Sequence, residues 1–181
     1  MESWIDSETL YKGKIFSLRV GVVRLEGGET AQREVIEHGG GVAVVPFADG
    51  KVTLVSQFRI AAGREIVELP GGRLEGDEPP ADCARRELEE ELGYHARELI
   101  HVSSYYTAAG YSSERMHLFL ALGLERTKPR PERDELLRRI ELPLEEVEAK
   151  LRRHELEDAR TIIGLHELVR YLRERPGETE G

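Results

Sequence analysis

The first third of the chain alternates between apolar and polar residues, with the period of two that is typical of β-strands. Glycine-rich stretches at 26–29 and 49–50 have the composition of hairpin turns, so the segments on either side should pair. The run 42–47 is almost continuously apolar, which indicates a strand covered on both faces. We therefore predict strands at 10–11, 15–16, 18–25, 30–38, 42–47, 51–58 and 65–69.

The middle of the chain changes to helical spacing. Four apolar residues recur at steps of three and four and should form one stripe facing a core: Ala81, Ala84, Leu88 and Leu92. Pro79 and Pro80 suit a first helical turn, and Gly93 suits the position just past the last turn. Beyond this helix we predict strands at 99–106, 115–122 and 141–142, a loop at 127–135, and helices at 143–153 and 159–173.

This order of elements indicates an α/β fold in which helices pack against a mixed sheet. With 181 residues, the chain has room for one domain and a small appended element. We expect an N-terminal strand region at 1–40, a main domain at 41–175 and a disordered tail at 176–181.

The predicted central helix carries acidic side chains on one face. Glu87 and Glu91 are four residues apart and Glu90 is three from Glu87, which places all three within about 100° of arc. Exposed carboxylates so close together repel, and a hard divalent cation would relieve the repulsion. The alternative is a solvated helix face on which Arg85 and Arg86 form ordinary ion pairs with glutamates one turn away.

Spacing outside the helix favours a metal site. The chain reads Gly72, five residues, Glu78, seven residues, Arg86-Glu87-Leu88, one residue, Glu90-Glu91, one residue and Gly93. This pattern resembles the Nudix box, the signature of hydrolases that cleave nucleoside diphosphates linked to another moiety. The last position of the box is usually aliphatic and is Tyr94 here, which we interpret as a conservative change in packing.

The resemblance implies a Nudix-type α/β/α sandwich with a mixed sheet, N-terminal antiparallel strands and C-terminal helices. It also implies metal-dependent hydrolysis, with Glu87, Glu91, Glu90 and the backbone carbonyl of Gly71 as metal ligands. Arg86 would orient the acids, so Arg86 and Glu90 are candidate catalytic residues as well. The expected cofactor is Mg²⁺, with Mn²⁺ or Zn²⁺ as alternatives.

Other segments resemble the ADP-ribose pyrophosphatase branch of the family over roughly residues 30–172. They are Gln57-Phe58-Arg59, Glu68-Leu69-Pro70-Gly71-Gly72, the stretch 33–38 and the stretch 106–114. The branch usually has a proline in the last of these stretches, where this chain has Ala109. The resemblance implies hydrolysis of ADP-ribose to AMP and ribose 5-phosphate, with Arg59 on the diphosphate and Glu114 on a ribose hydroxyl.

Enzymes of this branch are commonly homodimers that exchange N-terminal strands, so the resemblance implies dimerisation through 1–40. Arg33 and Trp4 are then candidates for contacts to the adenine, although we favour packing of Trp4 against its own domain. In this branch the catalytic base is often a glutamate on a loop after the box. Glu132, Asp134 and Glu135 lie in that region, and Glu135 is favoured because it precedes the next strand.

Two alternatives are consistent with the box. One is a Nudix hydrolase for FAD, NADH, a nucleoside triphosphate or a dinucleoside polyphosphate. The other is a non-catalytic domain that binds nucleotides as a regulator. The intact acids at positions 87, 90 and 91 disfavour the second alternative, because a binding module has no need of an unrelieved acidic cluster.

The amino-acid composition limits the classes of binding partner that we expect and indicates the habitat of the source organism. A net charge of −9 disfavours a nucleic-acid partner, and no apolar run of about 18 residues is present to span a membrane. The single cysteine and the lack of a signal-peptide pattern lead us to expect a cytoplasmic protein. The absence of Asn and the excess of 21 Arg over 5 Lys follow thermophile trends.

The single cysteine, Cys83, lies one turn before Glu87 on the predicted helix. A thiolate ligand at this position is an alternative to a small packed residue. Because hard cations prefer oxygen ligands, we expect Cys83 to be a packing residue.

Overall fold

In the computed structural model of the protein, the residues whose structure is described are 1–128 and 137–175. The chain forms two compact units. The first consists of Met1–Gly40 and Ser104–Met116, and the second consists of Gly41–Ser103 and the chain from His117 onward.

The first unit is built on an antiparallel sheet in the order β1-β2-β3. Its strands are β1 (Ser3–Lys12), β2 (Phe16–Arg24) and β3 (Thr30–His38). The predicted turn at 26–29 is confirmed, because the Leu25 N–H donates to the Glu29 carbonyl over 2.8 Å. Strand β1 begins earlier than the pattern predicted, since most of its side chains are exposed and an exposed edge strand needs no apolar alternation.

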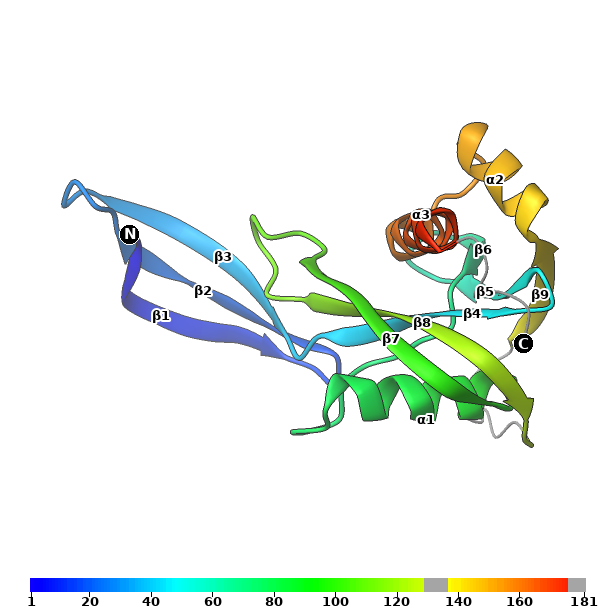
Figure 1. Ribbon diagram of the computed structural model, residues 1–181. Coiled ribbons are helices and arrows are strands. Elements are labelled where there is room, and N and C mark those ends of the chain that lie inside the picture. Colours follow the sequence, from blue (N-terminus) through cyan, green and yellow to red (C-terminus); the bar gives the residue numbers. More distant parts are fainter. Residues whose placement is uncertain (129–136, 176–181) are drawn as a thin grey trace. The chain divides into compact units, whose positions relative to one another are not determined.

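The second unit, in its described part, contains a six-stranded sheet in the order β6-β5-β4-β8-β7, with β9 paired to β5. Strand β5 pairs antiparallel with β4, β6 and β9, whereas β4 and β8 run in the same direction (Figure 1), so the sheet is mixed as predicted. The strands are β4 (Gly41–Ala48), β5 (Lys51–Arg59), β6 (Arg64–Glu68), β7 (Tyr94–Tyr106), β8 (Arg115–Arg126) and β9 (Arg138–Pro143). The end of β7, from Ser104, and the start of β8, up to Met116, are counted with the first unit.

Helices cover both faces of this sheet (Figure 1). Helix α1 (Pro80–Leu92) lies on one face, and α2 (Leu144–Arg152) and α3 (Ala159–Glu174) lie on the other. These three layers are those of the expected α/β/α sandwich. Strand β4 lies between them, and its residues Val42, Val44 and Val45 are fully buried, which confirms that this strand is covered on both faces.

Helix α1 begins and ends where its prolines and glycine predicted. Pro79 is the N-cap residue with extended backbone, and Pro80 lies in the first turn, where its missing N–H costs little. Gly93 closes the helix in the left-handed conformation at φ 65°, and its N–H donates to carbonyls of the last turn. The predicted apolar stripe is wrong at one position, because Ala81 is exposed and Cys83 packs into the core instead.

Tyr94 fills a core position directly after α1. Its side chain is buried in one cluster with Leu88, Leu92 and Phe119, so this last position of the box has a packing role as expected. The ring also lies 4.6 Å from the guanidinium of Arg139, which donates a hydrogen bond to the Tyr94 hydroxyl. The aromatic residue therefore adds a cation–π contact that an aliphatic side chain would lack.

Helix α3 packs closely on the sheet because it carries a glycine at the contact. A Cβ atom on Gly164 would lie 3.0 Å from Val45 Cγ2 and 3.1 Å from Leu118 Cδ1, and would overlap Leu69 Cδ1. The helix starts at an Asp158 cap, whose carboxylate accepts a bond of 2.9 Å from the Thr161 N–H. The close approach of Gly164 to Leu69 places α3 beside the chain that follows β6.

Strand ends are where the structure differs most from the sequence pattern. Strand β7 begins at Tyr94 rather than at 99, and β8 extends to Arg126 rather than to 122. The missed ends carry charged residues, which mask the alternation. Two predicted segments lie outside the described residues: positions 129–135 of the loop, and the disordered tail at 176–181. None of the described helices is both long and apolar enough to cross a membrane.

Substituting Gly164 with Ala should destabilise the protein by about 1–3 kcal/mol, because the added methyl group overpacks the contact between α3 and the sheet. This cost should exceed the gain in helix propensity of at most about 1 kcal/mol. Urea unfolding measures the difference. A matched control is Gly27→Ala, since a Cβ there meets no atom within 4 Å; it should change stability by less than about 0.5 kcal/mol. Wild-type stability of Gly164→Ala would contradict the packing argument.

Candidate active site

The acidic side of α1 is less exposed than the like-charge argument supposed. Glu87 and Glu91 each keep only 9% of their surface accessible, whereas the Glu90 side chain is 36% exposed. Burying a carboxylate requires hydrogen bonds or a counter-charge. The expectation of exposed acids is therefore wrong for Glu87 and Glu91, and their partners define the site.

Arg86 supplies the counter-charge. Its Nη1 donates to Glu87 Oε1 over 2.8 Å and to Glu90 Oε2 over 3.0 Å, while Nε and Nη2 donate to the two oxygens of Glu78, each over 3.1 Å. These bonds raise the pKa of Arg86, chiefly through Glu78, and Arg86 in turn lowers the pKa of Glu78. One guanidinium thus orients three carboxylates, two of them on α1.

A short extended segment after β6 faces these acids. The carbonyls of Pro70 and Gly72 accept bonds of 2.9 and 2.8 Å from the N–H groups of Val44 and Val42, so this segment is fixed to β4. Neither bond uses the carbonyl of Gly71, the predicted backbone ligand. The Gly71 N–H donates to Glu91 Oε2 over 3.0 Å.

Two glycines lie at this point of the chain, and the first of them is required by the backbone. Gly71 has φ 153°, at the edge of the region that side chains rarely adopt, and a Cβ there would overlap the Val42 carbonyl. A Cβ on Gly72 would overlap the carboxylate of Glu87. The glycines therefore let the backbone approach the carboxylates of α1 closely, which explains their place before the helix.

The donors suit a hard divalent cation in kind and number. Mg²⁺ typically takes one or two protein carboxylates and completes its shell with waters and substrate oxygens. Glu87 and Glu91 supply two carboxylates beside the Gly71–Gly72 backbone. Within residues 1–128 and 137–175, no group of three or more His, Cys, Asp or Glu side chains is placed to hold a metal ion. The two carboxylates of Glu87 and Glu91 are as many as Mg²⁺ typically takes from a protein.

Cys83 is a packing residue. Its side chain is fully buried, and Sγ donates to the Arg73 carbonyl over 3.3 Å. Burial raises the pKa of the thiol to about 12, so the group stays protonated at neutral pH.

Arg59 lies at the end of β5 and is bound to a buried glutamate. Its Nε and Nη2 donate to the two carboxylate oxygens of Glu68 over 2.8 and 2.6 Å. Arg160 of α3 donates to the same carboxylate over 2.7 Å. The hydrogen bond to Glu68 raises the pKa of Arg59, and the charges of Asp158 and Glu91 act in the same direction.

Sequence reasoning gave no role to Glu68 or Arg160. In the sequence, Glu68 is noticeable only as the first residue of the segment 68–72 that ends in the two glycines. Its partner Arg160 lies 92 positions further along the chain. A pairing across such a separation leaves no periodic signal. The Asp158–Thr161 pair at the start of α3 has the spacing of a helix cap, but a cap does not reveal which strand it touches.

Glu114, the predicted ribose ligand, belongs to the first unit. Its Oε2 accepts a bond of 2.6 Å from Thr107 Oγ1, and its Oε1 lies 3.8 Å from His38 Nδ1. The adjoining loop lines a hollow of about 310 Å³ in this unit, together with Tyr106 and Tyr111. Both tyrosines are more than half exposed.

Arg33 and Trp4, the predicted adenine contacts, also belong to the first unit. Arg33 donates to both carboxylate oxygens of Glu2, over 2.9 and 2.6 Å. Trp4 lies beneath the guanidinium of Arg19, 4.4 Å from the ring centre, so it packs within its own unit. The candidate bases Glu132, Asp134 and Glu135 lie outside the described residues.

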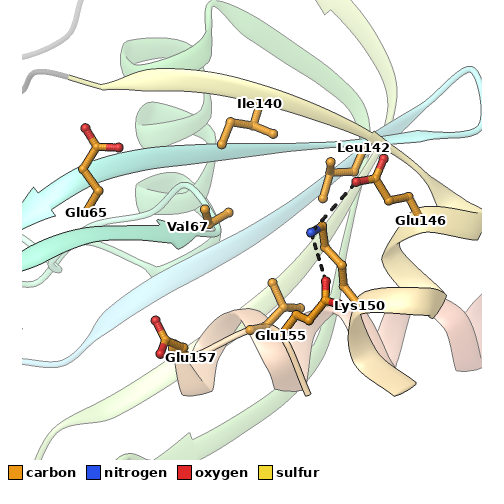
Figure 2. A pocket seen from close by; sticks show the side chains of 9 residues that line it. Glu65, Val67, Ile140, Leu142, Glu146, Lys150, Glu155 and Glu157 are labelled. Carbon is orange, nitrogen blue, oxygen red and sulfur yellow. Dashed lines mark hydrogen bonds and ion pairs between the residues drawn. The ribbon is translucent and has the colours of Figure 1, made fainter. Parts of the chain in front are cut away.

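A second hollow, of about 270 Å³, lies apart from the acids of α1, on the face of the sheet that α2 covers (Figure 2). Val67 and Leu142 form part of its apolar lining. Lys150 extends between Glu146 and Glu155, with ion-pair distances of 3.9 and 3.3 Å. Its lining contains no residue of α1 or of the glycine segment.

Known proteins resemble this chain over most of its length. It is 38% identical over 170 residues to an ADP-ribose pyrophosphatase of Bacillus subtilis, which covers 92% of each chain. It is 35% identical to a methanol dehydrogenase activator of Bacillus methanolicus, again over 92% of each chain. An ADP-ribose pyrophosphatase of Mycobacterium tuberculosis is 45% identical over 130 residues, covering 71% of this chain and 62% of that one.

A solved structure described as an ADP compounds hydrolase superposes with a TM-score of 0.85, over 96% of this chain and 95% of that one. Its sequence is only 21% identical, so the likeness concerns the fold, and it confirms the expected fold class. The family model of the NUDIX domain matches residues 37–164, a range that includes the glycine segment and the whole of α1. Together with the identities to the curated relatives, this match shows that the chain belongs to the Nudix family.

Proposed function

We propose that this protein hydrolyses ADP-ribose to AMP and ribose 5-phosphate with the help of a divalent cation, Mg²⁺ in the first place. The observation that carries the proposal is the pair of buried carboxylates, Glu87 and Glu91, held against the Gly71–Gly72 backbone. The names of two relatives as ADP-ribose pyrophosphatases support the choice of substrate.

The reaction adds one water across the pyrophosphate. The water oxygen forms a bond to one phosphorus, the bond from that phosphorus to the bridging oxygen breaks, and the bridging oxygen stays with the other phosphate. Both products are phosphate monoesters, so negative charge grows as the reaction proceeds. The site must therefore supply positive charge and accept a proton from water.

The residues of this chain can meet these needs. Glu87 and Glu91, with the Gly71 carbonyl and Glu90 as further candidates, would hold the cation, which when bound polarises phosphate oxygens and activates water. Arg86 keeps the carboxylates of Glu87 and Glu90 in a fixed orientation.

The proposal assigns three roles at the substrate. Arg59 offers a cation to the diphosphate, and Glu114 offers a carboxylate to a ribose hydroxyl. For the base we propose Glu135, with Glu132 as the alternative, on the evidence of the sequence alone.

The proposal also concerns the oligomeric state, the cellular location and the source organism. Strand β1 is an edge strand with the exposed apolar residues Ile5, Leu10 and Tyr11, which suits a homodimer formed through the N-terminal strands. Arg33 would then be a candidate for contact with the adenine in the partner subunit. A cytoplasmic location and a thermophilic source stay proposals from composition.

Removal of the metal should abolish hydrolysis. We expect ADP-ribose cleavage with Mg²⁺ present, no cleavage after EDTA, and recovery when Mg²⁺ is restored, because the carboxylates alone supply no positive charge to the phosphates. Chromatography of AMP measures each step. Full activity in metal-free buffer would exclude the proposed chemistry.

Glu87→Gln and Glu91→Gln should each lower kcat at least about a hundredfold, because each removes a charged ligand next to the developing phosphate charge. Both variants should fold, since glutamine keeps the size of glutamate and its amide oxygen at position 91 can still accept from the Gly71 N–H. The matched control is Glu89→Gln on the same helix, whose exposed carboxylate pairs with His95. Near-normal rates for both site variants would refute the assignment of these ligands.

ADP-ribose should be cleaved faster than nucleoside triphosphates, FAD, NADH or dinucleoside polyphosphates. Arg59→Ala should raise KM at least about tenfold, because a phosphate partner is lost. It should also lower the thermal stability, because the buried Glu68 then keeps only Arg160 as a partner. Glu114→Gln should impair ADP-ribose more than a nucleoside diphosphate without the terminal ribose. Arg64→Ala, which removes an exposed arginine from the same hairpin, is the control. If the protein prefers nucleoside triphosphates, the choice of ADP-ribose as substrate is wrong and only the class of reaction, hydrolysis of a pyrophosphate bond, remains.

A further inference from the structure

Glu68 is a buried carboxylate held from two sides. It ends β6, its side chain is only 3% exposed, and its two oxygens accept bonds of 2.8 and 2.6 Å from Arg59. Arg160 approaches from α3 and donates to Oε2 over 2.7 Å. Burying this charge would be strongly unfavourable without such partners.

The two arginines differ in what remains available to a ligand. Arg160 is 24% exposed, and its Nε faces Asp158 Oδ1 at 3.3 Å. Arg59 is 43% exposed, and among the described residues its side chain bonds only to Glu68. Because a guanidinium has five N–H groups in a planar fork, the Arg59 edge formed by Nη1 and Nη2 stays available to an anion.

The carboxylate of Glu68 is shared by two arginines. Arg160 donates to the same oxygen that accepts from Arg59 Nη2, so Glu68 fixes the geometry of Arg59 without being bound by Arg59 alone. Because Asp158 pairs with Arg160, the network has no net charge, and the attraction for phosphate comes from the accessible N–H groups of Arg59.

The network is anchored to the segment that leads to the metal ligands. The Leu69 N–H donates to Thr161 Oγ1 over 2.8 Å, and that hydroxyl donates to Asp158 Oδ2 over 2.7 Å. Leu69 directly precedes the segment 70–72, which approaches Glu87 and Glu91. The start of α3 therefore holds both Glu68 and the beginning of the glycine segment in one place.

We propose that Glu68 is the positioning residue for Arg59: it holds the guanidinium so that its outer edge faces the diphosphate. Glu68 itself does not touch the substrate, and Arg160 with the Asp158–Thr161 cap keeps Glu68 in position. The inference rests on the proposed function, in which Arg59 binds the diphosphate.

The first test is the kinetics of Glu68→Gln, with Glu65→Gln on the same strand as control. A glutamine can accept on one side only, so the guanidinium loses its fixed orientation. We expect KM for ADP-ribose to rise at least about tenfold, with kcat changed less than about threefold and no loss of folding. Glu65 is exposed, and Glu65→Gln should leave both constants unchanged. An unchanged KM in Glu68→Gln would overturn the proposal.

A double-mutant cycle separates positioning from a general structural role. If Glu68 acts through Arg59, then adding Glu68→Gln to Arg59→Ala should change KM less than about twofold. The same tenfold loss in both backgrounds would show that Glu68 acts independently of Arg59, which contradicts the proposal. Should Glu68→Gln fold poorly, Glu68→Asp keeps the charge but is one methylene shorter, and the same cycle applies.

Calorimetric binding of inorganic pyrophosphate with Mg²⁺ separates this inference from the choice of substrate. If the wild-type protein does not cleave ADP-ribose, the proposed function fails, and pyrophosphate binding decides the role of Glu68. Equal weakening by Arg59→Ala, by Glu68→Gln and by both together supports positioning. Additive weakening, or binding that Arg59→Ala leaves unchanged, overturns it.

Discussion

Packing Glu87, Glu90 and Glu91 on one side of α1 brings like charges together, and Arg86 is the residue that offsets the repulsion. Its guanidinium bonds to Glu87 and Glu90 and reaches Glu78 before the helix. Glu91, one turn further, is held by the Gly71 N–H instead. The helix can therefore carry buried carboxylates without a bound cation, so the proposed metal ligands are held in a fixed orientation in advance of binding.

The rest of the second unit supports this arrangement. A Cβ at position 71 would overlap the backbone of Val42, and a Cβ at position 72 would displace the carboxylate of Glu87. That segment is in turn fixed to β4 by hydrogen bonds from Val42 and Val44, and β4 is buried between α1 on one face and α3 on the other. The helix that carries the acids and the segment that faces them are thus both in contact with β4.

Much of this was predictable because it depends on local chemistry. Pro80 and Gly93 set the ends of α1, and helical spacing alone brings Glu87 and Glu91 to one side. The sequence pattern does not reveal that these acids are buried, because their burial depends on the segment 70–72, which the fold brings against the helix. It also gave no role to Glu68 and Arg160, whose bond joins distant parts of the chain. Ala81 has the right spacing for the core but lies in the exposed first turn.

Anomalous diffraction from crystals grown with Mn²⁺ tests the central claim most directly, since it locates the cation without reference to turnover. The account predicts an anomalous peak within about 2.0–2.6 Å of carboxylate oxygens of both Glu87 and Glu91, the range of cation–oxygen bonds. Arg86 should still be bonded to Glu78. A peak elsewhere on the protein, or none beside α1 at saturating Mn²⁺, would contradict the account.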